Sequence, residues 1–162
     1  MDSGAVVFRQ ARADDLPAIL TLLRDDRLGA VRETASEAAY ATAFARLLAE
    51  PDNHLIIGEI GGTPVATYQI TFITGLSLGA TRRAQIESVR VASGMRGAGL
   101  GARLMADATD RARAAGCTLM QLTTSASRAD AQAFYARLGF TPSHIGFKSQ
   151  ISPAEDPTCP TT

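Results

Sequence analysis

A chain of 162 residues with a formal net charge of zero is long enough for one domain with its own hydrophobic core. The balanced charge gives no support to nucleic acid or an anionic membrane as the main partner, and no apolar run approaches the ~20 residues that span a bilayer. The N-terminus lacks a signal-peptide pattern and the two cysteines, Cys117 and Cys159, suggest no disulfide framework. The expected compartment is therefore the cytoplasm.

The first third of the chain predicts a strand and two helices. Residues 5–10 predict an opening strand, and a helix follows whose apolar residues recur at i, i+3, i+4 and i+7 from Leu16. Thr34 and Glu37 form a Thr-x-x-Glu capping box, which predicts that the second helix begins there. The charged residues 24–33 between these helices predict a loop.

Two interpretations of this charged loop are open. It is either a solvated surface loop or part of an acceptor site, in which Asp25, Asp26 or Glu33 attracts a cationic amine. Further along, residues 54–60 and 64–73 predict two strands joined as a hairpin through Gly61-Gly62.

The stretch from Gln85 to Arg103 predicts a strand, a glycine turn and a helix. Alternation over 85–91 places Gln85, Glu87, Val89 and Val91 on one strand face. The run Arg96-Gly97-Ala98-Gly99-Leu100-Gly101 follows, and apolar residues at helical spacing begin inside it. Because glycines let backbone N–H groups converge on an anion at a helix N-terminus, this arrangement is typical of phosphate binding.

The glycine run lacks the features of two known phosphate-binding motifs. There is no Gly-Lys-Ser/Thr ending of a P-loop, and Gly-x-Gly-x-Gly does not match the Gly-x-Gly-x-x-Gly dinucleotide fingerprint. A merely structural glycine turn is the alternative interpretation.

The last third predicts a further strand at Leu119–Thr123, a short helix closed by Gly139, and a final strand or pair of strands over 140–151. Residues 152–162 are Pro/Thr-rich and are expected to be disordered. Residues 1–151 are therefore expected to form a single α/β domain, with a mixed sheet and helices on both faces.

Two motifs resemble those of the GNAT superfamily of acetyl-CoA-dependent N-acetyltransferases. Motif A, Arg/Gln-x-x-Gly-x-Gly/Ala after a strand ending in Val, is matched by Arg96, Gly99, Gly101 and Val91. Motif B is matched by Ala131-x-x-Phe134-Tyr135-x-x-x-Gly139-Phe140, and Arg128 stands where many members have Asn. The likeness spans roughly residues 5–151 and implies a GNAT-like central mixed sheet of about six to seven strands.

The resemblance also implies how acetyl-CoA, the expected cosubstrate, is held. The pantetheine arm would lie between two splayed strands and pair with backbone groups of Val89 and Val91. Backbone amides of the turn would hold the pyrophosphate, and Arg96 would either add charge near the phosphates or be solvated at the helix entry. Arg128 would either reach a CoA phosphate or be solvated. The turn comprises Arg96, Gly97, Ala98, Gly99, Leu100, Gly101 and Ala102.

Two residues are candidates for proton transfer. A primary amine has a reference pKa of ~10.4 and must lose a proton before it attacks a thioester, and Glu87 could take that proton through water. The alternative is that Glu87 pairs with Arg82 or Arg83. Tyr135, the tyrosine of motif B, matches the family's usual acid for the leaving thiolate.

The sequence thus predicts a transferase, specifically an acyltransferase that moves an acetyl group to a primary amine by direct transfer in a ternary complex. A small-molecule acceptor is favoured, with aminophosphonates and amino acids conceivable. The alternatives are a protein N-terminal or lysine acetyltransferase and a non-catalytic acyl-CoA-binding module. No metal is expected. A homodimer is expected, because relatives commonly associate through C-terminal strands and residues 143–151 would offer an exposed sheet edge.

Overall fold

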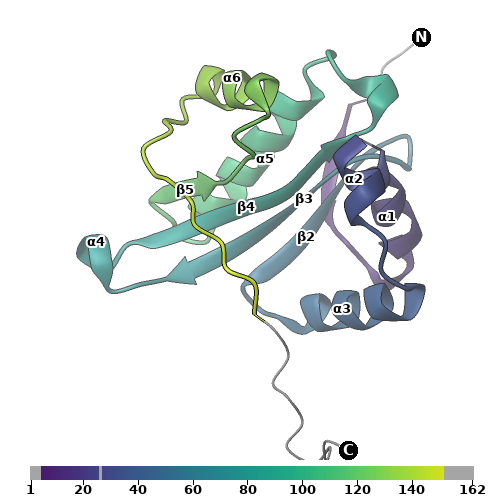
Figure 1. The fold of residues 1–162 in the computed structure, drawn as a ribbon, viewed down its shortest axis with the longest axis horizontal. Helices are drawn as coiled ribbons and strands as arrows, with labels where there is room; N and C mark the ends of the chain where they lie inside the picture. The colour runs from purple at the N-terminus through teal and green to yellow at the C-terminus, as the bar shows by residue number, and fades with distance from the viewer. Residues whose placement is uncertain (1–4, 26, 152–162) are drawn as a thin grey trace, which may run out of the picture.

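A five-stranded mixed sheet forms the centre of the protein, with strands in the order β1-β2-β3-β4-β5 (Figure 1). The computed structural model describes residues 5–25 and 27–151. Strands β1 to β4 pair antiparallel and β5 pairs parallel to β4. The strands are β1 Val7–Gln10, β2 Asn53–Ile60, β3 Thr63–Thr74, β4 Arg82–Val91 and β5 Leu119–Leu122.

Helices cover both faces of this sheet, as the sequence predicts. One face carries α5 (Leu100–Ala114) and α6 (Ala129–Arg137), and the other carries α1 (Leu16–Arg24), α2 (Arg27–Arg32) and α3 (Glu37–Ala49) (Figure 1). Short helical turns are η1 (Ala13–Asp15), α4 (Ser77–Ala80) and η2 (Ser93–Met95).

Two hydrophobic cores hold the layers together. The larger lies between the sheet and α5, where Leu104 and Ala108 are fully buried against Ile70 and Ile86. The smaller joins α1 and α3 to β2 through Ile19, Phe44 and Ile57 and their neighbours. Burial of apolar surface against α5 fixes one face of β4, while the smaller core lies on the other side of the sheet, over β2.

The sheet has fewer strands than the six to seven expected, because residues 140–151 form no strand. The segment contains alternating apolar residues but pairs with no described strand, and an extended segment becomes a strand only through hydrogen bonds to a neighbour. In Figure 1 it crosses the view in front of the sheet. The tail 152–162, expected to be disordered, lies outside the described residues.

Two local predictions in the first third were wrong. The charged segment forms the short helix α2 where a loop was expected. The capping residue of α3 is Ser36, whose Oγ accepts from the Ala39 amide at 3.2 Å, so the helix begins at Glu37 and Thr34 lies outside it. Both Thr34 and Ser36 suit a cap, and only one can precede the first turn.

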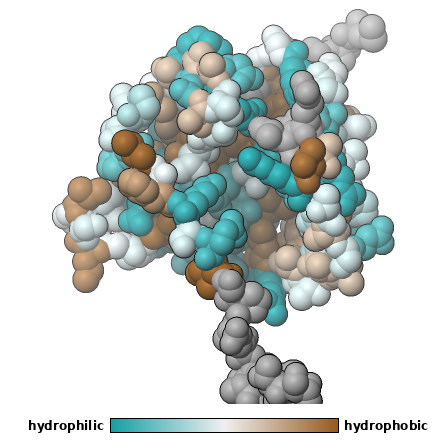
Figure 2. Space-filling view, in the orientation of Figure 1, coloured by the Kyte–Doolittle hydropathy of each residue, from teal (hydrophilic) through white to brown (hydrophobic). Residues whose placement is uncertain are grey.

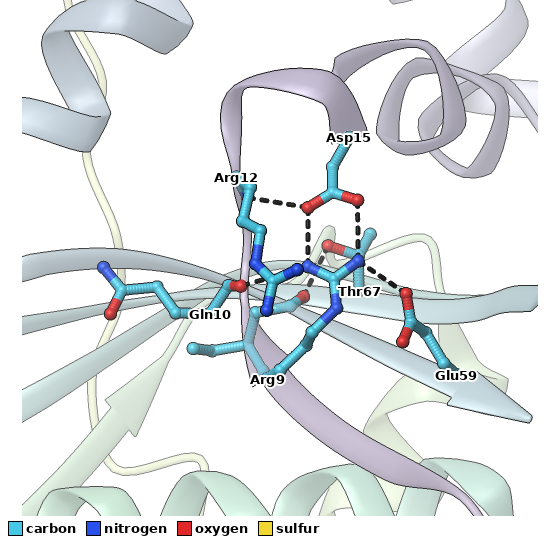
Figure 3. Close-up of polar contacts among 7 residues, drawn as sticks. Arg9, Gln10, Arg12, Asp15, Glu59 and Thr67 are labelled. Atoms are coloured by element: carbon cyan, nitrogen blue, oxygen red, sulfur yellow. Dashed lines mark hydrogen bonds and ion pairs between the residues drawn. The ribbon is translucent and has the colours of Figure 1, made fainter. Parts of the chain in front are cut away.

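An arginine between two carboxylates ties β1, η1 and β2 together (Figure 3). Arg9 donates from both terminal nitrogens to the carboxylate of Asp15, at 2.6 and 2.7 Å, and from Nη2 to Oε1 of Glu59 at 2.5 Å. Asp15 also accepts from the Arg12 amide at 2.6 Å. Asp15 is buried, and its bonds to Arg9 hold its pKa below the ordinary value despite the opposing effect of burial.

Candidate active site

The parallel strands β4 and β5 pair over only four residues and then part. Their register runs from Arg83 opposite Leu119 to Ile86 opposite Leu122. Beyond Ile86, β4 continues to Val91 without a neighbouring strand on that side among the strands that the structure describes. An extended ligand could lie along this edge of β4 as an added strand would.

A bulge in β4 lies just beyond Ile86, the last residue that pairs with β5. Thr67 faces Arg90 and Gln69 faces Glu87, so Ser88 and Val89 together lie opposite one residue of β3. Ser88 has a φ of 52°, in the left-handed region that non-glycine residues seldom occupy. The bulge reverses the alternation of side chains along the strand.

This reversal corrects the predicted face of Glu87. Val89 and Val91 pack with Ile86 in the core beneath α5, whereas Glu87, next to Ile86, lies exposed on the opposite face. The expectation that Glu87 shares a face with Val89 and Val91 was wrong, because it assumed uninterrupted alternation. Glu87 forms no ion pair with any residue that the structure describes, and Arg82 pairs with Asp52 at 2.6 Å.

The glycine turn after β4 is open toward solvent. Gly97 and Gly99 have φ values of 82° and 76°, and a Cβ built on either meets no atom within 4 Å. Gly99 is the N-cap of α5, whose first amides point out of the helix. The space over bare backbone at a helix N-terminus fits a pyrophosphate.

The third glycine of the run has a different role. A Cβ on Gly101 would lie 3.2 Å from Cζ of Phe134. Gly101 therefore allows α6 to pack closely against the start of α5, which joins the residues of motif B to the turn of motif A.

Arg96 does not extend freely from the turn. Its Nε donates to the carbonyl of Val91 at 3.2 Å and its Nη2 donates to the carbonyl of Asp25 at 2.9 Å. The carboxylate of Asp25 accepts from the Ser93 amide at 2.5 Å. Sequence reasoning missed this contact, because 68 residues separate Asp25 from Ser93.

Two acids of the charged segment that the structure describes, Asp25 and Glu33, have separate partners. Asp25 binds Ser93, while Glu33 accepts from the Tyr40 hydroxyl at 3.0 Å. Asp26 lies outside the described residues.

Tyr135 lies half-buried in the core between α6 and the sheet, 5.8 Å from the Phe140 ring between centroids. Burial raises the pKa of its phenol, and the charges of Arg128 and Arg90 act against that rise. Tyr135 thus carries its proton at neutral pH. Arg128, half-buried, is the N-cap residue of α6.

Amide side chains line the other face of the sheet, beside Glu87. Gln121 of β5 donates to Oε1 of Gln85 on β4 at 2.8 Å, and Gln69 of β3 donates to Oδ1 of Asn53 on β2 at 2.9 Å. All four are half-buried. The pairing of Gln85 with Gln121 depends on the register of β4 against β5, which the periodicity of the sequence does not determine.

Neither a metal site nor a membrane span is evident in the part of the chain that the structure describes. No group of three or more His, Cys, Asp or Glu side chains there could hold a metal ion. No helix within residues 5–25 and 27–151 is long and apolar enough to cross a bilayer.

Comparison with known proteins identifies the family of this chain. Residues 16–140 match the model of the acetyltransferase (GNAT) family. The chain is 29% identical over 144 residues to an aminoalkylphosphonate N-acetyltransferase of Salmonella typhimurium, which covers 89% of this chain and 90% of that protein.

Solved structures share the fold. A transcriptional regulator from Bacillus halodurans C-125 is 39% identical with a TM-score of 0.86, over 91% of this chain and all of that one. The aminoglycoside N-acetyltransferase AAC(6')-Iy in complex with CoA has a TM-score of 0.77 at 16% identity, over 93% of this chain and 98% of that one, and so shares the fold. The protein belongs to the GNAT acetyltransferase family and is an acyltransferase, in a family that uses acetyl-CoA.

Proposed function

We propose that this protein transfers the acetyl group of acetyl-CoA to a primary amine of a small molecule, by direct attack in a ternary complex. The observation that carries the proposal is that β4 continues beyond Ile86, the last residue that pairs with β5, and leads into the open turn at the N-terminus of α5. Val89 and Val91 would pair with the pantetheine amides, and the amides of 96–102 would receive the pyrophosphate.

Glu87 and Tyr135 then supply the proton transfers. The amine nitrogen attacks the thioester carbon and gives its proton, through water, to the Glu87 carboxylate. The carbon–sulfur bond breaks, and the departing thiolate takes a proton from the Tyr135 hydroxyl. The exposure of Glu87 and the protonated state of Tyr135 at neutral pH support these roles.

The acceptor is an amine with polar groups. The half-buried row of Gln85, Gln121 and Gln69 lies on the same face as Glu87 and offers both donors and acceptors of hydrogen bonds. The relative from Salmonella typhimurium acts on aminoalkylphosphonates, so these are the first acceptors to test. A protein N-terminus or lysine is the second class.

Turnover of acetyl-CoA by the pure protein tests the proposal. We expect thiol release with at least one member of a panel of aminoalkylphosphonates, amino acids, aminoglycosides and lysine peptides. Binding of CoA without turnover on any amine would instead indicate a non-catalytic acyl-CoA-binding module. Release with peptides alone would favour the protein acetyltransferase.

The cofactor site is tested by Gly99→Val. The substitution adds side-chain atoms where the pyrophosphate must approach and strains a backbone with φ of 76°. We expect CoA binding, measured by calorimetry, to be lost in a folded variant. Gly116→Val is the matched control, because Gly116 has a φ of 75° and equally open surroundings at the other end of α5. Equal CoA affinity in both variants would contradict the assignment.

A further inference from the structure

Asp25 stands at a position that is unfavourable for its own helix. It is the C-cap residue of α1, where the partial negative charge of the helix end disfavours a carboxylate. The backbone amide of Asp25 caps the helix by donating to the Leu22 carbonyl at 3.3 Å. The side-chain carboxylate takes no part in this cap. The benefit of an acid at this position must therefore lie in its contacts outside α1.

Those contacts all reach the segment that leads into the glycine turn. The Asp25 carboxylate accepts a hydrogen bond at 2.5 Å from the amide of Ser93, which is the first residue of η2. It also lies 3.9 Å from Nη2 of Arg96. The Asp25 carbonyl accepts from the same nitrogen at 2.9 Å. Asp25 thus holds the first residue of η2 through its carboxylate, and it holds the side chain of Arg96, the residue after η2, through its backbone carbonyl.

The remaining contacts fix η2 to the sheet. The Ala92 amide donates to the carbonyl of Val65 on β3 at 2.8 Å, and Nε of Arg96 donates to Val91 at 3.2 Å. The surroundings of Gly97 and Gly99 are open, and the turn continues into the buried start of α5 at Leu100. The direction in which its amides point is therefore set by two supports, the start of α5 and the segment just before the turn.

We propose that Asp25 is a positioning residue for the cofactor, which orients the glycine turn toward the pyrophosphate of acetyl-CoA by holding η2 and Arg96 against α1. Arg96 is about half exposed and uses two of its five N–H donors in these contacts, so the others are available to a phosphate. This inference rests on the proposed function, in that CoA must bind at the turn.

The charge of Asp25 and its role in positioning predict opposite changes in CoA affinity when the carboxylate is removed. A carboxylate near an anion site repels phosphate, so its removal should strengthen CoA binding if charge alone mattered. If positioning matters, Asp25→Ala should weaken CoA binding by about tenfold, the effect of one charge-assisted hydrogen bond. Asp25→Asn keeps an oxygen for the Ser93 amide and should bind CoA nearly as the parent does.

Calorimetry of CoA binding to the full chain measures these effects, with Asp110→Ala as control. Asp110 is also a carboxylate paired with an arginine, but it lies exposed on α5. Steady-state kinetics should show a raised KM for acetyl-CoA in Asp25→Ala and little change in kcat at saturation. Parent-like CoA affinity in Asp25→Ala, or an equal loss in Asp25→Asn, would overturn the proposal.

A double-mutant cycle tests whether Asp25 acts through Arg96. In an Arg96→Ala background, Asp25→Ala should cost less CoA affinity than it does alone, because the ion pair between the two side chains is already absent; full additivity would count against positioning of Arg96 by Asp25. Failure of the parent to bind CoA, or normal binding by Gly99→Val, would instead contradict the proposed function.

Discussion

Single residues decide where the reacting groups of this acetyltransferase can meet. The positive φ of Ser88 turns β4 so that Val89 and Val91 join the core, while Glu87 stays exposed beside the amide row. A residue held in the left-handed region costs of the order of 1 kcal/mol or more, which the surrounding sheet must supply. The bulge lies where pairing between β4 and β5 ends. The strained residue Ser88 is therefore located at the proposed reaction centre.

Glu87→Gln tests the proton path at this scale. Glutamine keeps the shape and hydrogen bonding of glutamate but accepts no proton, so we expect kcat to fall by ~10²–10⁴-fold while CoA binding persists. Raising the pH should partly restore turnover, because more of the amine then arrives neutral. The measurement is the pH–rate profile at saturating acetyl-CoA.

Tyr135→Phe is the comparison for that experiment. It should also slow turnover, but high pH should not restore the rate in the same way, since the missing group is a proton donor. An overlaid profile for Glu87→Gln, with less than a few-fold loss, would end the assignment of Glu87 as base and leave the acetyltransferase activity in place.

At the scale of elements, the parts that the sequence predicts are those with local causes. The helix α5 and its glycine turn follow from residues within one stretch, and the hairpin of β2 and β3 follows from Gly61-Gly62. The bulge at Ser88 depends on the register of β3 against β4, and the bond between Asp25 and Ser93 joins distant segments. The periodicity of the sequence predicts neither the bulge nor this hydrogen bond, because both depend on tertiary packing.

The contact of Arg9 with Asp15 and Glu59 gives the elements β1, η1 and β2 a pH-dependent link (Figure 3). The folded-state pKa of Asp15 lies below its ordinary value of 3.8, chiefly because of Arg9. A lowered pKa contributes stability that is present above about pH 4 and is lost as the pH falls through the folded-state value.

We expect Asp15→Asn to lower the free energy of unfolding at pH 7 by about 1–3 kcal/mol, through loss of a charge-assisted pair with Arg9. The difference from the parent should shrink below pH 4, where the parent's own Asp15 becomes protonated. Urea unfolding at pH 7, 5 and 3 measures this. Asp110→Asn, an exposed carboxylate beside Arg113, should change little at any pH, and a pH-independent loss in Asp15→Asn would contradict the linkage.

For the whole molecule, the exposed apolar residues of the C-terminal segment point to association. Ile145, Phe147 and Ile151 are 84%, 93% and 93% exposed on a segment that pairs with no described strand. The sheet ends nearby at β5, whose Leu119 is 41% exposed. Further brown side chains lie over α4 at the left of Figure 2, where Leu76 and Leu78 are exposed. Protein–protein interfaces are one kind of site at which contiguous apolar surface is exposed on a single chain.

We propose that a second copy covers the C-terminal segment, which makes the protein a homodimer. Phe147→Asp should then convert a dimer mass to a monomer mass in light scattering at micromolar concentration, because a charge would replace a large apolar side chain inside the interface. The melting temperature of the parent should rise with protein concentration, and that of the variant should not. Val31→Asp, at an exposed apolar residue of α2, is the matched control and should leave the dimer mass unchanged. A monomer mass for the parent would refute the homodimer, whereas an unchanged dimer mass in Phe147→Asp would place the interface on another surface.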